Sequence, residues 1–176
     1  MNGAAQRFVS LLVALMIAAG GCRARTRTLI ECLPHDRQAS PWVLDGAAWK
    51  GSFAAAERAL GEDAVFWRPH APTSVWLARY VHERDPRRRV VLRAFAFASP
   101  EDAQAAYDFV RAKDARPFSA GDQACWTADG LLVRWGRMVW ELFASEDSHE
   151  ARPEQVVFLL SYLEQHIDPA LPVDPQ

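Results

Sequence analysis

The fold is decided by two β-rich runs, SVWLARYVH at residues 74–82 and RVVLRAFAFA at residues 89–98. The charged segment between them, residues 83–88, contains an Asp-Pro pair that favours a turn. This arrangement predicts two antiparallel strands joined as a hairpin. Apolar residues occupy both faces of the second run, with Arg93 as the exception, which predicts a central strand packed on both sides.

A second hairpin is predicted over residues 131–143, where two apolar runs flank a tight turn at residues 135–137. Trp126 is expected to begin a further short strand that leads into this hairpin. The sequence Ala-Val-Phe-Trp at residues 64–67 is also expected to form a brief strand, which the two prolines of residues 68–72 would end.

Three helices are predicted. Residues 53–60 form an Ala-rich stretch between a serine suited to an N-cap and a glycine suited to stop the helix. The sequence Ser-Pro-Glu-Asp at residues 99–102 predicts a second helix start, because it places a cap, a proline and two acids in the favoured order. This helix is expected to end near Asp114. A third helix is predicted from residue 153 to 166, with apolar side chains along one side.

The order of these elements is not the regular alternation of strands and helices that a parallel sheet requires. We therefore expect an α+β fold, with an antiparallel sheet built from two hairpins and covered by two or three helices. The expected single domain covers residues 41–167. Residues 168–176 are rich in proline and are expected to form a loose tail.

Residues 1–21 are typical of a bacterial export signal. Arg7 supplies the positive start, and the apolar run at residues 8–19 is shorter than the roughly 20 residues of a membrane span. The sequence Ala-Gly-Gly-Cys at residues 19–22 resembles a lipobox, the motif of bacterial lipoprotein signals. The resemblance implies that Cys22 becomes the first residue and carries a lipid.

The lipobox resemblance further implies a protein held on a membrane of the bacterial cell envelope through its N-terminal lipid, facing the periplasm or the exterior. Residues 22–40 are then the lipid anchor and a tether that begins with a basic segment. One alternative stays open, an ordinary secretory peptide in which Cys22 is an incidental thiol.

The formal net charge is −2, and Arg7 is the only charged residue among residues 1–21, so the exported chain carries −3. This nearly neutral balance offers no basic face for nucleic acid, which we exclude as a partner. The arginine-rich hairpin tip at residues 84–89 has two interpretations. It is either a solvated turn or a contact for anionic head groups or an acidic partner, which Glu83 and Asp85 would weaken.

Lipidation of Cys22 leaves Cys32 and Cys125 as a pair in a compartment that is usually oxidising. A disulfide between these two cysteines is expected, and two unrelated buried thiols are the alternative. The sequence contains no CxxC, no His/Cys cluster and no HExxH. We therefore expect neither a metal site nor a cofactor.

The sequence lacks a GxSxG motif, a Gly-rich phosphate loop and the carboxylate pair of a glycosidase. We expect no catalytic residue and no enzymatic activity. A binding role is suggested by the seven tryptophans, several of which fall on or beside predicted strands, and by two arginines on those strands. The candidate ligand-binding residues are Trp67, Trp76, Trp126, Trp140, Arg79 and Arg93. Tryptophans that simply fill the core are the alternative.

Three short segments, residues 99–103, 121–124 and 130–134, resemble a layout found in uncharacterised secreted bacterial lipoproteins and envelope sensor domains. The likeness covers roughly residues 89–167. It implies an α+β fold and an envelope location, and no catalytic residue is carried over. We expect a lipid-anchored, non-catalytic binding or accessory module for another envelope protein. The alternative is a carrier or sensor of a small apolar or amphipathic ligand in an aromatic-lined pocket.

Overall fold

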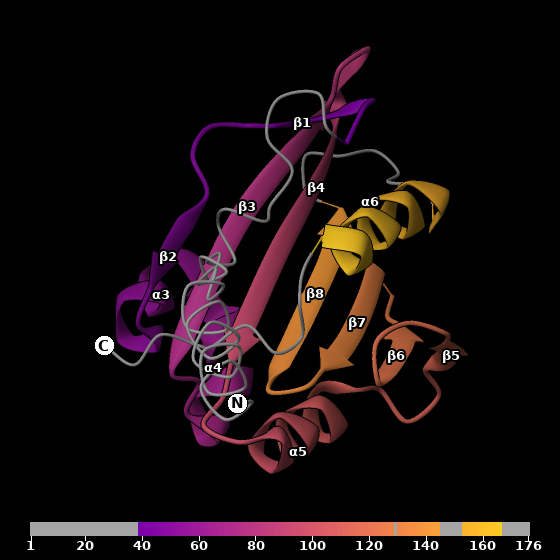
Figure 1. Cartoon of the computed structure of the whole chain (residues 1–176). Helices are drawn as coiled ribbons and strands as arrows, with labels where there is room; N and C mark the ends of the chain where they lie inside the picture. Colours follow the sequence, from indigo (N-terminus) through magenta and orange to yellow (C-terminus); the bar gives the residue numbers. More distant parts are fainter. Residues whose placement is uncertain (1–38, 129, 145–152, 167–176) are drawn as a thin grey trace, which may run out of the picture.

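An antiparallel sheet of eight strands forms the centre of the computed structural model, which describes residues 39–128, 130–144 and 153–166 (Figure 1). The strands follow the order β1-β3-β4-β8-β7-β6-β5, and β2 also pairs with β3. Their bounds are β1 Trp42–Leu44, β2 Trp49–Gly51, β3 Ser74–His82, β4 Asp85–Ala96, β5 Arg116–Phe118, β6 Gln123–Trp126, β7 Gly130–Trp135 and β8 Met138–Ala144.

Helices cover both faces of this sheet. They are α3 Phe53–Leu60, α4 Ala64–Trp67, α5 Pro100–Val110 and α6 Pro153–His166, with the short 3-10 turns η1 Gly61–Asp63 and η2 Arg68–His70 beside α4. The predicted α+β fold with an antiparallel sheet is confirmed, although the described residues form four α-helices instead of the two or three expected. No helix in the described ranges has the length and apolar character needed to cross a bilayer.

Both predicted hairpins are present, and they join through the pairing of β4 with β8. The sheet is larger than two hairpins because β1, β2 and β5 add three-residue strands, and β6 continues it beyond β7.

The first hairpin turns more sharply than expected. His82 pairs with Asp85, so the turn is only Glu83-Arg84 and most of the charged segment belongs to β4. Pro86 is tolerated in this strand because β8 pairs with β4 only from Val90 onward, which leaves one side of the strand free near the proline.

The prediction of a brief strand at residues 64–67 was wrong, because these residues form helix α4. Ala64 and Trp67 are both buried at helical spacing, so packing of one helical side decided the conformation. Helix α5 ends at Val110 and not near Asp114, because the backbone of Arg111 is already extended. The caps of α3 and α5 are those expected, with Ser52 and Ser99 accepting hydrogen bonds from backbone amides.

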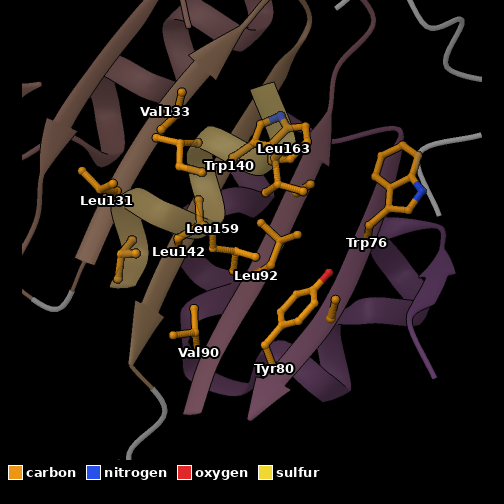
Figure 2. Close-up of a cluster of buried hydrophobic side chains, with 14 of the residues drawn as sticks. Trp76, Tyr80, Val90, Leu92, Leu131, Val133, Trp140, Leu142, Leu159 and Leu163 are labelled. Atoms are coloured by element: carbon orange, nitrogen blue, oxygen red, sulfur yellow. The ribbon is translucent and has the colours of Figure 1, made fainter. Parts of the chain in front are cut away.

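Side chains alternate between the two faces of the sheet. We call the side that packs against α6 the α6 face, and the side that packs against α3, α4 and α5 the α5 face. Figure 2 shows the α6 face, where Leu159 and Leu163 of α6 lie over Leu92 and Leu142. On the α5 face, Phe95 packs with buried residues of the other three helices.

Several expectations concern residues outside the described ranges. They are the export signal at residues 1–21, the lipid site Cys22, Cys32, most of the tether and the tail at residues 168–176. These stay predictions.

Candidate functional site

The structure divides the six candidate ligand-binding residues between the two faces of the sheet. Trp76, Trp126 and Trp140 lie on the α6 face. Trp67 packs on the α5 face, where strand alternation also places Arg79 and Arg93. One shared pocket therefore does not unite all six residues, and the two faces need separate consideration.

On the α6 face, Trp76 and Trp140 flank one small residue. The register pairs Trp76 of β3 with Ala94 of β4, and Ala94 with Trp140 of β8. Both indoles are buried, with 4% and 2% of their surface exposed. Trp126 lies farther along this face, partly buried, with its ring 5.3 Å from that of Phe118.

A third aromatic residue, Tyr80, joins this group and was missed from the sequence. It lies on β3 with Trp76 and is fully buried. Figure 2 shows Trp76 and Tyr80 on the β3 side of the cluster, away from helix α6. The spacing in the sequence could have identified Tyr80. Trp76, Ala78 and Tyr80 are two residues apart along one strand and so lie on the same face.

These three aromatic side chains have buried polar atoms that no described residue pairs with. Neither the Nε1 atoms of Trp76 and Trp140 nor the hydroxyl of Tyr80 finds a hydrogen-bond partner within the described part of the chain. A buried donor left unpaired costs about 1–3 kcal/mol. Burial also raises the pKa of Tyr80 above its usual value, with Tyr162 contributing in the same direction. We call Trp76, Tyr80 and Trp140 the donor cluster.

A positive charge lies next to the donor cluster. The ammonium nitrogen of Lys50, on β2, is 5.4 Å from the centre of the Trp76 ring. This is the distance of a cation–π contact. The donor cluster therefore combines N–H and O–H donors with a nearby cation, a combination suited to electron-rich oxygen atoms.

Trp67 has a packing role on the other face. Its ring stacks on Phe95 at a centroid distance of 3.8 Å and an interplanar angle of 15°, with 1% of its surface exposed. Arg79 is exposed, and only its backbone has a described bond, from the amide of Asp45 to the Arg79 carbonyl at 2.7 Å.

Arg93 forms a charged group on the α5 face. Its Nη1 lies 2.6 Å from Oδ2 of Asp63 and 3.7 Å from Oε2 of Glu141. The guanidinium also lies over the ring of Phe143, 4.4 Å from its centre. Neither acid was a sequence candidate, although Glu141 is the one charged residue of the otherwise apolar strand β8.

The carboxyl of Glu141 titrates far from its ordinary range. Burial raises its pKa to about 7, the negative charge of Asp63 adds to the rise, and the guanidinium of Arg93 opposes it. Glu141 Oε2 has no hydrogen-bond partner among the described residues. The group can therefore take up or release a proton near neutral pH.

Cys125 lies on the α5 face as a buried free thiol. Burial raises the pKa of Tyr107, and a hydrogen bond with Cys125 adds to the effect. The expected partner, Cys32, lies outside the described residues, so the disulfide stays a prediction. Ala39 comes seven positions after Cys32, and seven steps of extended chain span about 25 Å at most. Ala39 bridges to Trp42 of β1, five strands away from Cys125 in the sheet order. A disulfide between Cys32 and Cys125 would therefore require residues 32–39 to be almost fully extended.

No group of three or more His, Cys, Asp or Glu side chains is placed to hold a metal ion in the part of the chain that the structure describes. No protein-family model, curated protein or solved structure matches this chain. The chemistry of the donor cluster and of the Arg93 group is thus the basis for assigning a function.

Proposed function

We propose that this protein is a lipid-anchored, non-catalytic binding module of the bacterial cell envelope, and that the donor cluster binds its ligand. The observation that carries this proposal is the set of three buried donors on one face of the sheet for which no described residue is a hydrogen-bond partner. A ligand that supplies acceptors to Trp76, Tyr80 and Trp140 would offset their desolvation cost.

The surroundings of the donor cluster favour an amphipathic ligand. Ala78, Ala94 and Ala96 are buried in the same core cluster as the aromatic side chains and make their surroundings apolar. Ligand sites commonly combine such apolar walls with a few polar groups that fix orientation. The nearby charge of Lys50 favours an acceptor that is anionic or strongly polar.

Native mass spectrometry of the full-length protein, extracted from host membranes in mild detergent, tests ligand binding. We expect a small-molecule adduct on the wild type that decreases strongly in Tyr80→Phe and Trp76→Phe. Trp49→Phe is the matched control, because Trp49 is partly exposed on β2 and pairs with Leu77 on the other face. Absence of an adduct, or equal adducts in all variants, would contradict ligand binding at this cluster.

The lipid anchor in this proposal is supported by the lipobox-like sequence at residues 19–22. Several acyl chains on one N-terminus give stable membrane residence, whereas a single chain binds only marginally. A Cys22→Ser variant should lose the lipid and should leave the membrane fraction.

A protein partner is the second candidate, and exposed apolar side chains support it. Val65 and Phe66 of α4 are 57% and 53% exposed, and Phe109 of α5 is 58% exposed. The rings of Phe109 and His70 lie 4.9 Å apart, which joins α5 to η2 beside α4. Grouped exposed apolar residues mark interaction surfaces.

Photo-crosslinking in the host tests for this partner. A benzoylphenylalanine placed at Phe66 or Phe109 should capture one recurrent envelope protein, and a probe at the exposed Arg116 should not. Capture at neither apolar position, or equal capture at Arg116, would contradict a partner at this surface.

A further inference from the structure

We infer that the tip of the β3–β4 hairpin docks on anionic lipid head groups of the membrane that carries the anchor. This inference rests on the lipid anchor of the proposed function and adds a second membrane contact. The hairpin tip is defined here as residues 83–89.

The described chain begins next to this tip. The amide of Glu83 donates a hydrogen bond to the carbonyl of Pro41 at 2.8 Å. Trp42 pairs with His82 in the sheet, and their rings meet edge to face at 5.4 Å. Figure 1 shows β1 beside the upper part of the hairpin, at the opposite end of the sheet from α4 and α5. A lipid on Cys22 therefore holds the domain through the end that carries the tip.

The tip is basic. Four arginines, Arg84, Arg87, Arg88 and Arg89, stand against two acids, Glu83 and Asp85. Asp85 is occupied by Arg87, whose Nε lies 3.2 Å from Oδ1. Arg84 and Arg88 form no ion pair with any residue that the structure describes, and Arg84 is exposed.

Arginine is suited to this role because its planar guanidinium donates two parallel hydrogen bonds to phosphate. Arginine side chains attract an anionic membrane surface when they lie within about one Debye length of it. The tether, with Arg23, Arg25 and Arg27, adds positive charge of the same sign to the sequence between lipid and domain.

The length of the tether permits the contact. The 17 residues from Cys22 to Gln38 span at most about 60 Å, so the domain can approach the surface in several orientations. Anchoring raises the effective concentration of head groups around the domain. A cluster of arginines that is too weak to bind a membrane by itself can therefore still fix the orientation of the anchored domain. The sheet has two ends. The hairpin tip lies at the end that the tether joins.

The full-length lipidated protein in vesicles provides the test. Vesicles of pure phosphatidylcholine are compared with vesicles that contain three parts in ten of phosphatidylglycerol, and hydrogen–deuterium exchange is followed in the peptide that covers residues 83–89. We expect at least threefold slower exchange of this peptide on the anionic vesicles. The protection should disappear in 0.5 M NaCl, because salt screens the charges.

A double variant, Arg84→Glu with Arg88→Glu, should remove the protection while the protein still floats with the vesicles. The matched control is Arg58→Glu with Arg116→Glu, which changes the net charge equally at two exposed positions on α3 and β5. The control should keep the protection. Loss of protection in both double variants would overturn the assignment to the tip.

Flotation distinguishes failure of docking from failure of the anchor. A protein that floats on both kinds of vesicle with equal exchange at residues 83–89 keeps its anchor and overturns the docking. A protein that floats on neither kind overturns both. Protection that appears only after an acidic protein is added would also overturn the docking, because the tip would then bind a protein surface.

Discussion

Arg93 and Glu141 lie directly opposite each other on β4 and β8, with 3.7 Å between Nη1 and Oε2. The same nitrogen atom of Arg93 lies closer to Asp63, at 2.6 Å. One guanidinium therefore pairs with two carboxylates, and Glu141, the more buried of the two acids, has the longer contact. This unequal sharing explains why Arg93 does not keep the pKa of Glu141 low.

The pKa of Glu141 predicts how stability depends on pH. The folded protein keeps a proton on Glu141 up to about pH 7, whereas the ordinary value is 4.5. Between these pH values the folded state holds more protons than the unfolded state. The contribution of Glu141 to the free energy of unfolding therefore falls as pH rises from about 4.5 to about 7, by at most ~3 kcal/mol.

Glu141→Gln should remove this contribution, because an amide does not titrate. Chemical denaturation at pH 4.5, 6 and 7.5 measures it, as the difference between the wild type and the variant. The exposed acid Glu101 of α5 provides the control variant, Glu101→Gln, which should change little across the series. A constant difference between wild type and Glu141→Gln would show that Glu141 does not titrate in this range.

The unpaired hydroxyl of Tyr80 predicts an unusual response to substitution. In ligand-free protein, Tyr80→Phe should leave the free energy of unfolding unchanged or raise it by about 1 kcal/mol, because the hydroxyl has no hydrogen bond to any described residue. Tyr107→Phe is the comparison, because the Tyr107 hydroxyl is not among the buried atoms without a partner and the Cys125 thiol contributes to the raised pKa of Tyr107. It should cost about 1 kcal/mol. Clear destabilisation by Tyr80→Phe would indicate that this hydroxyl is already paired.

Gly130 at the start of β7 predicts a strict size limit. A Cβ at this position would collide with the backbone carbonyl of Leu142 on β8. Gly130→Ala should therefore destabilise the protein by about 3 kcal/mol in urea denaturation. Gly46→Ala is the control: its φ of +84° costs about 1 kcal/mol, but its Cβ meets no neighbouring atom. Equal losses for both variants would contradict the collision.

The state of Cys125 can be measured by alkylation. Within the described ranges Cys125 is a buried thiol without a disulfide partner, and a thiol in this state would be alkylated slowly in the folded protein and rapidly after unfolding without reductant. A peptide map identifies the modified cysteine. Alkylation of Cys125 that requires a reductant would instead show that Cys125 is in a disulfide, and the peptide linked to it in the unreduced map would show whether the partner is Cys32.

Local signals in the sequence predicted much of the fold. Ser52 and Ser99 cap their helices as expected, because a cap depends on neighbouring residues only. The hairpin strands β3 and β4 were predicted from their apolar patterns. Residues 64–67 were assigned wrongly because four residues give too short a period, and burial of Ala64 and Trp67 selected a helix. Strands of three residues, such as β1, carry no usable period.

The candidate site is formed by contacts between residues far apart in the sequence. Such contacts could not be predicted from local sequence patterns. Arg93 was recognised as an exception on its strand, but its partner Asp63 is 30 residues away and Glu141 lies across a strand register. Trp67 shares composition with Trp76, yet only packing shows that the two lie on opposite faces. The direction in which a side chain points had to come from the structure.

The lipid anchor underlies the envelope location, the proposed ligand binding there and the docking of the hairpin tip. Its most direct test is the intact mass of the protein extracted from host membranes, measured under denaturing conditions. We predict a mass that corresponds to residues 22–176 with a diacylglyceryl group and an additional acyl chain or free amine on Cys22. An unmodified chain, whether it begins at Met1 or after another cleavage site, would contradict lipid anchoring through Cys22.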